Sequence, residues 1–414
     1  MINMQTLYLD SDKLDENAVG DVTLKTLVER EQEFVDSLRN YDDVSEMHDA
    51  LEAASLGGTL SVEQATQYAA TMQKHLGQSY GLEDYSGSMP VLYAGMALEG
   101  FTDVIKTLWA KVRDGFRKLI AFIMDCFKRI TSNLNRVYKA AEKVIKVTTA
   151  KRKDAPPNGR KCKVLKNKYL YVNGQYDVKG PDRVTGLLLK MNESIPDNLG
   201  NLVVRVANMV TRNREASDFD KLVTDFTKAE TDAMKFAKNS VSDSDNPFKR
   251  PGTKCQRTDL IAANKALYVI TADSKGANAI EIMKNFTKKF DMHLHVVKDM
   301  NKPIKGVETK VRPPNILIGD MRGVMTAIET YQKAETNISN IRKNMDRAIQ
   351  STNNIADNES MDKDRRMSIR AAMDSLMACR KLMGSNIVGT YALCASTLKA
   401  HVKQAREELK HYQS

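Results

Sequence analysis

The chain has 414 residues, enough for two or three domains, and its 42% apolar and 28% charged content is ordinary for a soluble globular protein. The N-terminus lacks the basic and apolar regions of a secretory signal, and the longest uncharged run, 382–398, is too short and too polar to favour a membrane span. Five scattered cysteines have neither zinc-ligand nor redox spacing, so we expect reduced thiols.

Charge divides the chain into two parts of opposite sign. Residues 1–99 contain 18 acidic and 5 basic residues, a balance of −13, whereas residues 100–414 contain 34 acidic and 58 basic residues, a balance of +24. The overall charge of +11 therefore conceals an acidic arm joined to a basic body. Such asymmetry favours separate roles for the two parts.

The acidic arm, residues 1–99, is expected to contain two helices and a flexible linker. Apolar residues near helical spacing predict a helix at about 21–53. A capping box formed by Ser61 and Gln64, with Gly77 at the far end, predicts a second helix at 61–76. The glycines and the proline of residues 81–99 indicate a flexible linker, the kind of segment that proteases cut.

Residues 100–147 have the clearest helical pattern in the chain. Apolar residues recur at three- and four-residue steps from Phe101 to Val144, and the opposite face carries a net charge of +7. A stripe this wide, which includes Trp109, favours a core helix. A basic amphipathic helix that binds a membrane surface is the alternative.

A basic linker and a β-hairpin are expected in residues 148–182. Asn173-Gly174 lies between short alternating segments and predicts the turn of the hairpin. Lysines and arginines can neutralise phosphates and tyrosines can stack on bases, so this region is a candidate nucleic-acid interface. A solvated hairpin whose tyrosines pack on their own sheet explains the pattern equally well. The candidate contacts are Lys151, Arg152, Lys153, Arg160, Lys161, Lys163, Lys166, Lys168, Tyr169 and Tyr171.

The remaining chain is expected to be mixed and then helical. Residues 183–319 combine a helical pattern with short apolar runs and a helix near 277–290, which favours a small α+β unit. Residues 320–414 predict a C-terminal helical bundle with helices at about 321–350, 360–383 and 387–412 and a turn at Gly384. The fold class is therefore mainly α with a small β component (α+β).

Catalytic motifs are absent, so we do not expect an enzyme or a cofactor. The sequence contains no phosphate loop, no dinucleotide-binding glycine pattern and no zinc-protease motif. His293 and His295 share one face of an expected strand and are possible metal ligands, but no cysteine or third histidine lies near them in the sequence. A structural role for both histidines is favoured, and no metal site is predicted.

A candidate cleavage site stands at the charge reversal. In Ala97-Leu98-Glu99 followed by Gly100, a small residue and a carboxylate lie two positions apart, so an extended peptide presents both to one side. A protease that binds its substrate as an added strand reads such a pair. The triplet is common, but only this copy lies in the expected linker directly before a new helix. Glu99 is alternatively an acidic first-turn residue favoured by the helix dipole.

These residues, together with the basic helix that follows them, resemble precursors of the internal head proteins of large contractile-tailed bacteriophages. The resemblance covers about 50 residues. It implies an acidic propeptide removed by the phage prohead protease after Glu99, with secondary cuts at Glu52, Glu63 and Glu83. It also implies assembly in the host cytoplasm with capsid or scaffold proteins, and a mature body in the virion interior. There the body is expected to contact packaged double-stranded DNA without sequence preference.

Two alternatives remain open from the sequence. In the first, the chain is an uncleaved nucleic-acid-binding or interaction protein with an acidic regulatory domain. In the second, it is a membrane-active protein that acts through helix 101–147.

Overall fold

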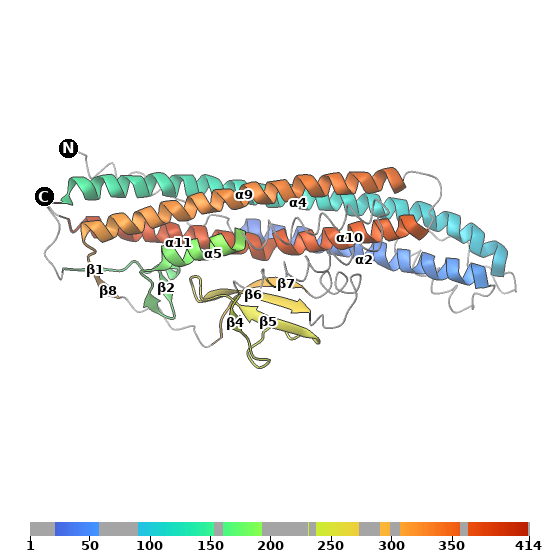
Figure 1. Cartoon of the computed structure of the whole chain (residues 1–414), viewed down its shortest axis with the longest axis horizontal. Coiled ribbons are helices and arrows are strands. Elements are labelled where there is room, and N and C mark those ends of the chain that lie inside the picture. Colours follow the sequence, from blue (N-terminus) through green and yellow to red (C-terminus); the bar gives the residue numbers. More distant parts are fainter. Residues whose placement is uncertain are drawn as a thin grey trace.

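The computed structural model describes residues 21–57, 90–152, 160–192, 231, 237–272, 290–298, 307–356 and 363–412. Long helices lie lengthwise beside one another, and a small sheet packs along one side of them (Figure 1). This arrangement confirms the prediction of a mainly α protein with a small β component. The expected helices at 61–76 and 277–290 lie outside the described residues.

The acidic helix α2 (Asp21–Gly57) packs along the long helix α4 (Pro90–Ala150). Phe34 contacts Phe116 with ring centroids 5.5 Å apart, and Tyr41 contacts Trp109 at 5.6 Å. The residue numbers fall on one helix as they rise on the other, so the two helices are antiparallel. The helix expected at 21–53 is therefore present and belongs to the same hydrophobic core as the basic body.

The buried face of α2 follows the heptad spacing of a coiled coil. Its buried positions repeat at alternating steps of four and three residues, the 3.5-residue period that keeps one stripe against a partner helix. The four large apolar side chains of this stripe, together with Val44 beside it, contribute roughly 8–15 kcal/mol, at about 1.5–3 kcal/mol for each. The stripe contains Leu27, Glu31, Phe34, Leu38, Tyr41, Ser45 and His48, with Val44 beside it.

Helix α4 begins at Pro90, so the prediction of a flexible linker was wrong for residues 90–99. Proline suits the first position of a helix because its fixed φ is helical and it has no N–H to leave unpaired. Gly95 and Gly100 each cost about 1 kcal/mol relative to alanine, but they lie within a helix of 61 residues that propagates through them. The proline and the glycines of this segment therefore do not interrupt the helix, although their presence favoured a linker.

The apolar face of α4 lies inside the bundle. Trp109 is 3% exposed, and Val112 and Phe116 are fully buried. In this arrangement the face is not available to a membrane surface, which favours the core helix over the membrane-active alternative. No helix among the described residues is long and apolar enough to cross a bilayer.

Three C-terminal helices complete the bundle: α9 (Pro314–Ala356), α10 (Lys363–Met383) and α11 (Ser385–Leu409). They confirm the expected helices and the turn at Gly384. A Cβ at residue 384 would lie 1.9 Å from Glu31 Oε1 and 2.7 Å from the Arg380 carbonyl oxygen, so a side chain there would displace the Glu31 carboxylate and clash with the backbone. Glu31 uses this space to accept a hydrogen bond from the Ser385 N–H at 2.8 Å, at the start of α11.

The centre of the bundle is aromatic. Tyr391 of α11 contacts Phe127 of α4 and Tyr331 of α9, with ring centroids 5.3 and 5.4 Å apart. The Tyr331 hydroxyl donates to the Phe127 carbonyl at 3.2 Å. Asn192, at the end of α5 (Gly180–Asn192), donates to the Thr330 carbonyl at 2.8 Å. These contacts join four helices in one core.

The small sheet has the antiparallel order β4-β5-β6-β7, formed by Asn239–Ser240, Thr253–Arg257, Lys265–Ala272 and Asp291–Val296. Strand β7 lies against α11, where the Leu294 N–H donates to Asn386 Oδ1 at 3.2 Å. Part of the α+β unit expected in residues 183–319 is therefore this sheet, attached to the bundle through its last strand.

The predicted hairpin is confirmed. The 3₁₀ helix η2 (Lys168–Leu170) leads into β2 (Tyr171–Val172), which pairs with β3 (Gln175–Tyr176). Asn173 and Gly174 have φ values of 52° and 75°, the left-handed conformations that a tight hairpin turn requires.

Candidate nucleic-acid interface

A basic two-stranded ribbon lies at one end of the bundle. Strand β1 (Lys161–Lys163) pairs antiparallel with β8 (Glu308–Lys310), about 145 residues later in the chain (Figure 1). Lys161 lies opposite Lys310, and Lys163 lies opposite Glu308. All four side chains are exposed, whereas Cys162 points inward and is buried. The ribbon therefore presents three ammonium groups and one carboxylate to solvent.

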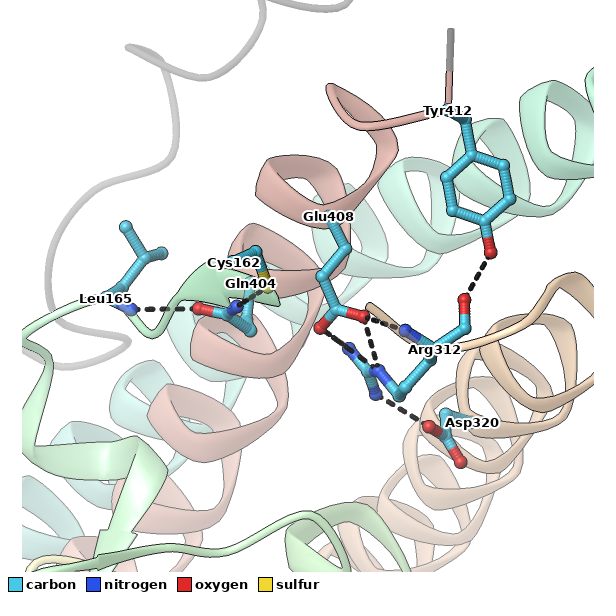
Figure 2. Close-up of polar contacts among 7 residues, drawn as sticks. All are labelled: Cys162, Leu165, Arg312, Asp320, Gln404, Glu408 and Tyr412. Atoms are coloured by element: carbon cyan, nitrogen blue, oxygen red, sulfur yellow. Dashed lines mark hydrogen bonds and ion pairs between the residues drawn. The ribbon is translucent and has the colours of Figure 1, made fainter. Parts of the chain in front are cut away.

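Helix α11 holds the β1 side of the ribbon through Gln404. Gln404 Oε1 accepts the Leu165 N–H at 2.9 Å, and its Nε2 lies 3.9 Å from Cys162 Sγ (Figure 2). Gln404 is fully buried, so these contacts satisfy an amide that would otherwise be costly to bury.

Glu408, one helical turn further along α11, holds the β8 side. Its carboxylate accepts the Arg312 backbone N–H at 3.0 Å, Nε at 2.9 Å and Nη2 at 2.7 Å (Figure 2). Arg312 Nη1 donates to Asp320 Oδ2 at 2.6 Å, and the Tyr412 hydroxyl donates to the Arg312 carbonyl. Arg312 follows β8 by two residues, so this network fixes the strand to the helix.

Burial strengthens the Arg312 network. The side chains of Arg312 and Glu408 are 8% and 0% exposed. Desolvation acts to lower the pKa of Arg312, but hydrogen bonds and negative charge from Glu408, together with the charge of Asp320, outweigh it and raise that pKa. Desolvation also raises the pKa of Asp320, against the opposing attraction of Arg312.

A neutral histidine lies beside this network on the same face of α11. His401 is fully buried, its ring stacks with Tyr176 of β3 at 6.3 Å, and neither ring nitrogen has a hydrogen-bond partner. Desolvation, followed by the charge of Arg312, lowers its pKa to about 3. The ring fits because residue 180 is glycine: a Cβ there would lie 2.2 Å from His401 Nε2.

The structure brings several of the predicted nucleic-acid contacts together at this end. Lys161 and Lys163 lie on β1, with Lys166 and Lys168 in the segment that leads to the hairpin, and all four are exposed. Arg160 is half-buried and precedes β1 directly.

Two further candidates lie at the end of α4. Arg152 is exposed, whereas the Lys151 ammonium donates to the Tyr412 carbonyl at 3.2 Å and is half-buried. Lys153 lies outside the described residues.

In this conformation Tyr171 is not available to stack on bases, contrary to the expectation from the sequence. Tyr171 is 2% exposed and packs against Tyr176 with ring centroids 6.5 Å apart. Tyr169 is half-buried against the core, and the Lys168 ammonium lies 5.3 Å from its ring centroid. The alternative in which the tyrosines pack on their own fold explains these positions, and the candidate interface is therefore cationic rather than aromatic.

Sequence reasoning missed Lys310 and the buried anchors Arg312, Gln404 and Glu408. The two strands have only three residues each, too few to show a period, and they are distant in the sequence. One signal was available in α11, where His401, Gln404 and Glu408 place polar groups on one face of a largely buried helix.

The predicted cleavage residues lie on helices where they are described. Ala97, Leu98, Glu99 and Gly100 fall within the first part of α4, and Glu52 lies near the end of α2. The other secondary candidates, Glu63 and Glu83, lie outside the described residues. The bond after Glu99 is thus helical in this structure, not extended.

His293 and His295 have aromatic neighbours. The ring of His293 stacks on Phe248 at 4.2 Å, and His293 Nε2 lies 3.2 Å from Asp291 Oδ2. His295 contacts Phe248 edge-on at 5.6 Å. Across the part of the chain that the structure describes, no three histidine, cysteine or acidic side chains gather in a group that could hold a metal ion. All five cysteines are buried and unbonded to one another.

The fold and this surface define a mainly helical protein whose cationic ribbon is fixed to the bundle by buried polar contacts. The family described as phiKZ-like phage internal head proteins matches residues 13–406. The chain belongs to this family, which places it in the interior of the virion as a structural head protein. No curated protein and no solved structure matches the chain.

Proposed function

We propose that the chain is made as a precursor, cut by the phage prohead protease after Glu99, and that its basic body contacts packaged DNA through the β1–β8 ribbon. The family supports the location inside the head. The single observation that carries the DNA contact is the ribbon itself, whose exposed Lys161, Lys163 and Lys310 are fixed by buried contacts to α11.

Cleavage requires the start of α4 to unwind. Proteases bind the scissile segment in extended form, whereas residues 90–100 are helical. Unwinding is favoured at this place because helix ends open at little cost and Gly95 and Gly100 weaken the helix. The helical start of α4 therefore limits the cut to a locally opened state and does not forbid it.

Peptide mapping of purified particles tests the cut. A peptide of residues 100–106, beginning at Gly100 and ending at the tryptic site Lys106, is expected in mature particles. Changing Glu99→Gln in the phage genome should abolish that peptide, whereas Glu83→Gln should leave it. A peptide that spans the intact Glu99–Gly100 bond in mature particles would contradict the precursor proposal.

DNA contact by the ribbon should be electrostatic and independent of sequence. Each phosphate neutralised contributes about −0.9 to the slope of log K against log salt on duplex DNA. Replacing Lys161, Lys163 and Lys310 with alanine should therefore reduce the magnitude of the slope by about 2 to 3. The side chains are exposed, so the fold should survive.

Lysines on α4 provide the matched control. Lys111 and Lys118 are exposed but lie outside the ribbon, and Lys118 pairs with Asp114 at 2.7 Å. The Lys111→Ala, Lys118→Ala variant should change the slope by less than about 1. An equal loss per lysine in the two variants would show that the whole basic surface binds DNA and the ribbon has no special part.

A further inference from the structure

We propose that α2 stays bound to the body as a non-covalent subunit after the chain is cut. For its biological setting this inference rests on the proposed cleavage after Glu99. A propeptide that makes few contacts with the mature protein detaches once the connecting bond is broken. Here the described part of the acidic arm is built into the core of the protein that it accompanies.

The first support is the shared hydrophobic core. Leu27, Phe34 and Tyr41 of α2 are 0–1% exposed, and the rings of Phe34 and Tyr41 pack on Phe116 and Trp109 of α4. Departure of α2 would return both sides of this contact to water. The heptad spacing of the α2 stripe is that of stable two-helix interfaces, which need no covalent link between the helices.

The second support is a polar anchor to a different helix. Glu31, itself 9% exposed, accepts the Ser385 N–H at the start of α11, and Gly384 leaves room for its carboxylate. The Arg30 guanidinium lies 5.1 Å from the Phe122 ring centroid on α4. These contacts fix the register of α2 on the body in addition to its burial.

The third support is the position of the expected cuts. Glu52, Glu63, Glu83 and Glu99 all follow His48, the last residue of the α2 stripe whose burial the structure describes. Cleavage at all four would leave a fragment of residues 1–52 that still carries every stripe residue named above. This fragment contains 14 acidic and 4 basic residues, a balance of −10.

The retained helix would leave the DNA-binding end open. Figure 1 shows α2 along the half of the bundle that is remote from β1 and β8. The bound fragment would lower the body's charge of +24 to +14 without covering the ribbon. The retained part of the acidic arm would then be a permanent part of the fold and would lower the net charge of the body.

A nicked protein tests retention directly. A recognition sequence for a site-specific protease is inserted between Gly81 and Pro90 of the full chain, and the purified protein is cut to completion. At about 1 µM protein, co-elution of the two pieces in equal amounts on size exclusion is expected, because retention needs a Kd below about 1 µM. Separation of the fragment from the body would overturn the proposal.

Variants of two neighbouring glutamates test the anchor. In the nicked protein, Glu31→Ala should speed release of the fragment about tenfold, since it removes a hydrogen bond to a charged group. Glu33→Ala, at an exposed position two residues away, should change release less than about twofold. Equal effects would overturn the role of Glu31. None of these results depends on natural processing, so an uncut Glu99–Gly100 bond in particles would refute the proposed cleavage alone.

Discussion

Among the polar contacts named above, we expect the Arg312–Glu408 pair to cost the most stability when it is broken by substitution. The change Glu408→Ala removes the acceptor of three Arg312 N–H groups and leaves the buried guanidinium with Asp320 as its remaining carboxylate. Breaking a buried ion pair from one side costs about 3–5 kcal/mol, because an uncompensated charge stays buried. We therefore expect a loss of stability of that size.

Glu407 is the matched control. It lies next to Glu408 on α11 and pairs with Lys410 at 2.5 Å, but both side chains are more than a third exposed. The change Glu407→Ala should therefore cost less than about 1 kcal/mol. The two variants remove the same carboxylate from adjacent positions, so the difference between them isolates burial and the contact with Arg312.

Two measurements decide the result. Urea unfolding followed by circular dichroism gives the change in stability of each variant. Hydrogen exchange of the amides in β1 and β8 reports local loss of the ribbon and should accelerate about 100-fold or more in Glu408→Ala alone. Similar stability and exchange in the two variants would refute the claim that Glu408 fixes the ribbon.

Two further predictions follow from the packing around His401. Gly180→Ala should cost about 1–3 kcal/mol because the new Cβ meets the His401 ring, whereas Gly186→Ala, with open space in the same helix, should stabilise by about 0.5–1 kcal/mol; thermal unfolding separates them. The pKa of His401 is about 3 in the folded chain against an ordinary 6.5, so only the unfolded chain takes up this proton between those values. The stability that this site contributes is complete above pH 6.5 and falls as the pH drops toward 3, by up to about 1.4 kcal/mol per pH unit. His401→Leu should flatten that part of a stability–pH curve, and an unchanged curve would contradict the assignment.

Periodic and local signals predicted the helices and the hairpin. Apolar residues at three- and four-residue steps located the cores of α2, α4 and the C-terminal helices, and Asn173-Gly174 located the tight turn. These features depend on neighbours within one or two turns, which a single sequence displays directly. The start of α4 was misplaced because Pro90 and Gly95 resemble a linker, although proline also begins helices.

The candidate site could be predicted only in part. Exposed lysines of β1 were found from local charge, but their pairing with β8 depends on contacts between residues about 145 positions apart. The anchors Gln404 and Glu408 belong to no local motif, because their role depends on burial against a segment that is distant in the sequence. Tyr171 is buried and so is not part of the candidate interface, and its aromatic character alone did not indicate this burial.

Charge asymmetry suggested a separable acidic arm, and packing changed that interpretation. A net charge describes long-range fields, whereas attachment depends on the apolar stripe of the same helix. Helix α2 is acidic on its exposed face and integrated through its buried one. A cut after Glu99 and loss of the arm are therefore distinct events.

Quantitative peptide mapping of purified particles tests this account most directly. The account predicts the peptide that begins at Gly100 and, in an equal molar amount, the tryptic peptide of residues 31–39 from the buried stripe of α2. Absence of residues 31–39 beside an abundant Gly100 peptide would contradict retention of α2. An intact bond between Glu99 and Gly100 would contradict the precursor itself.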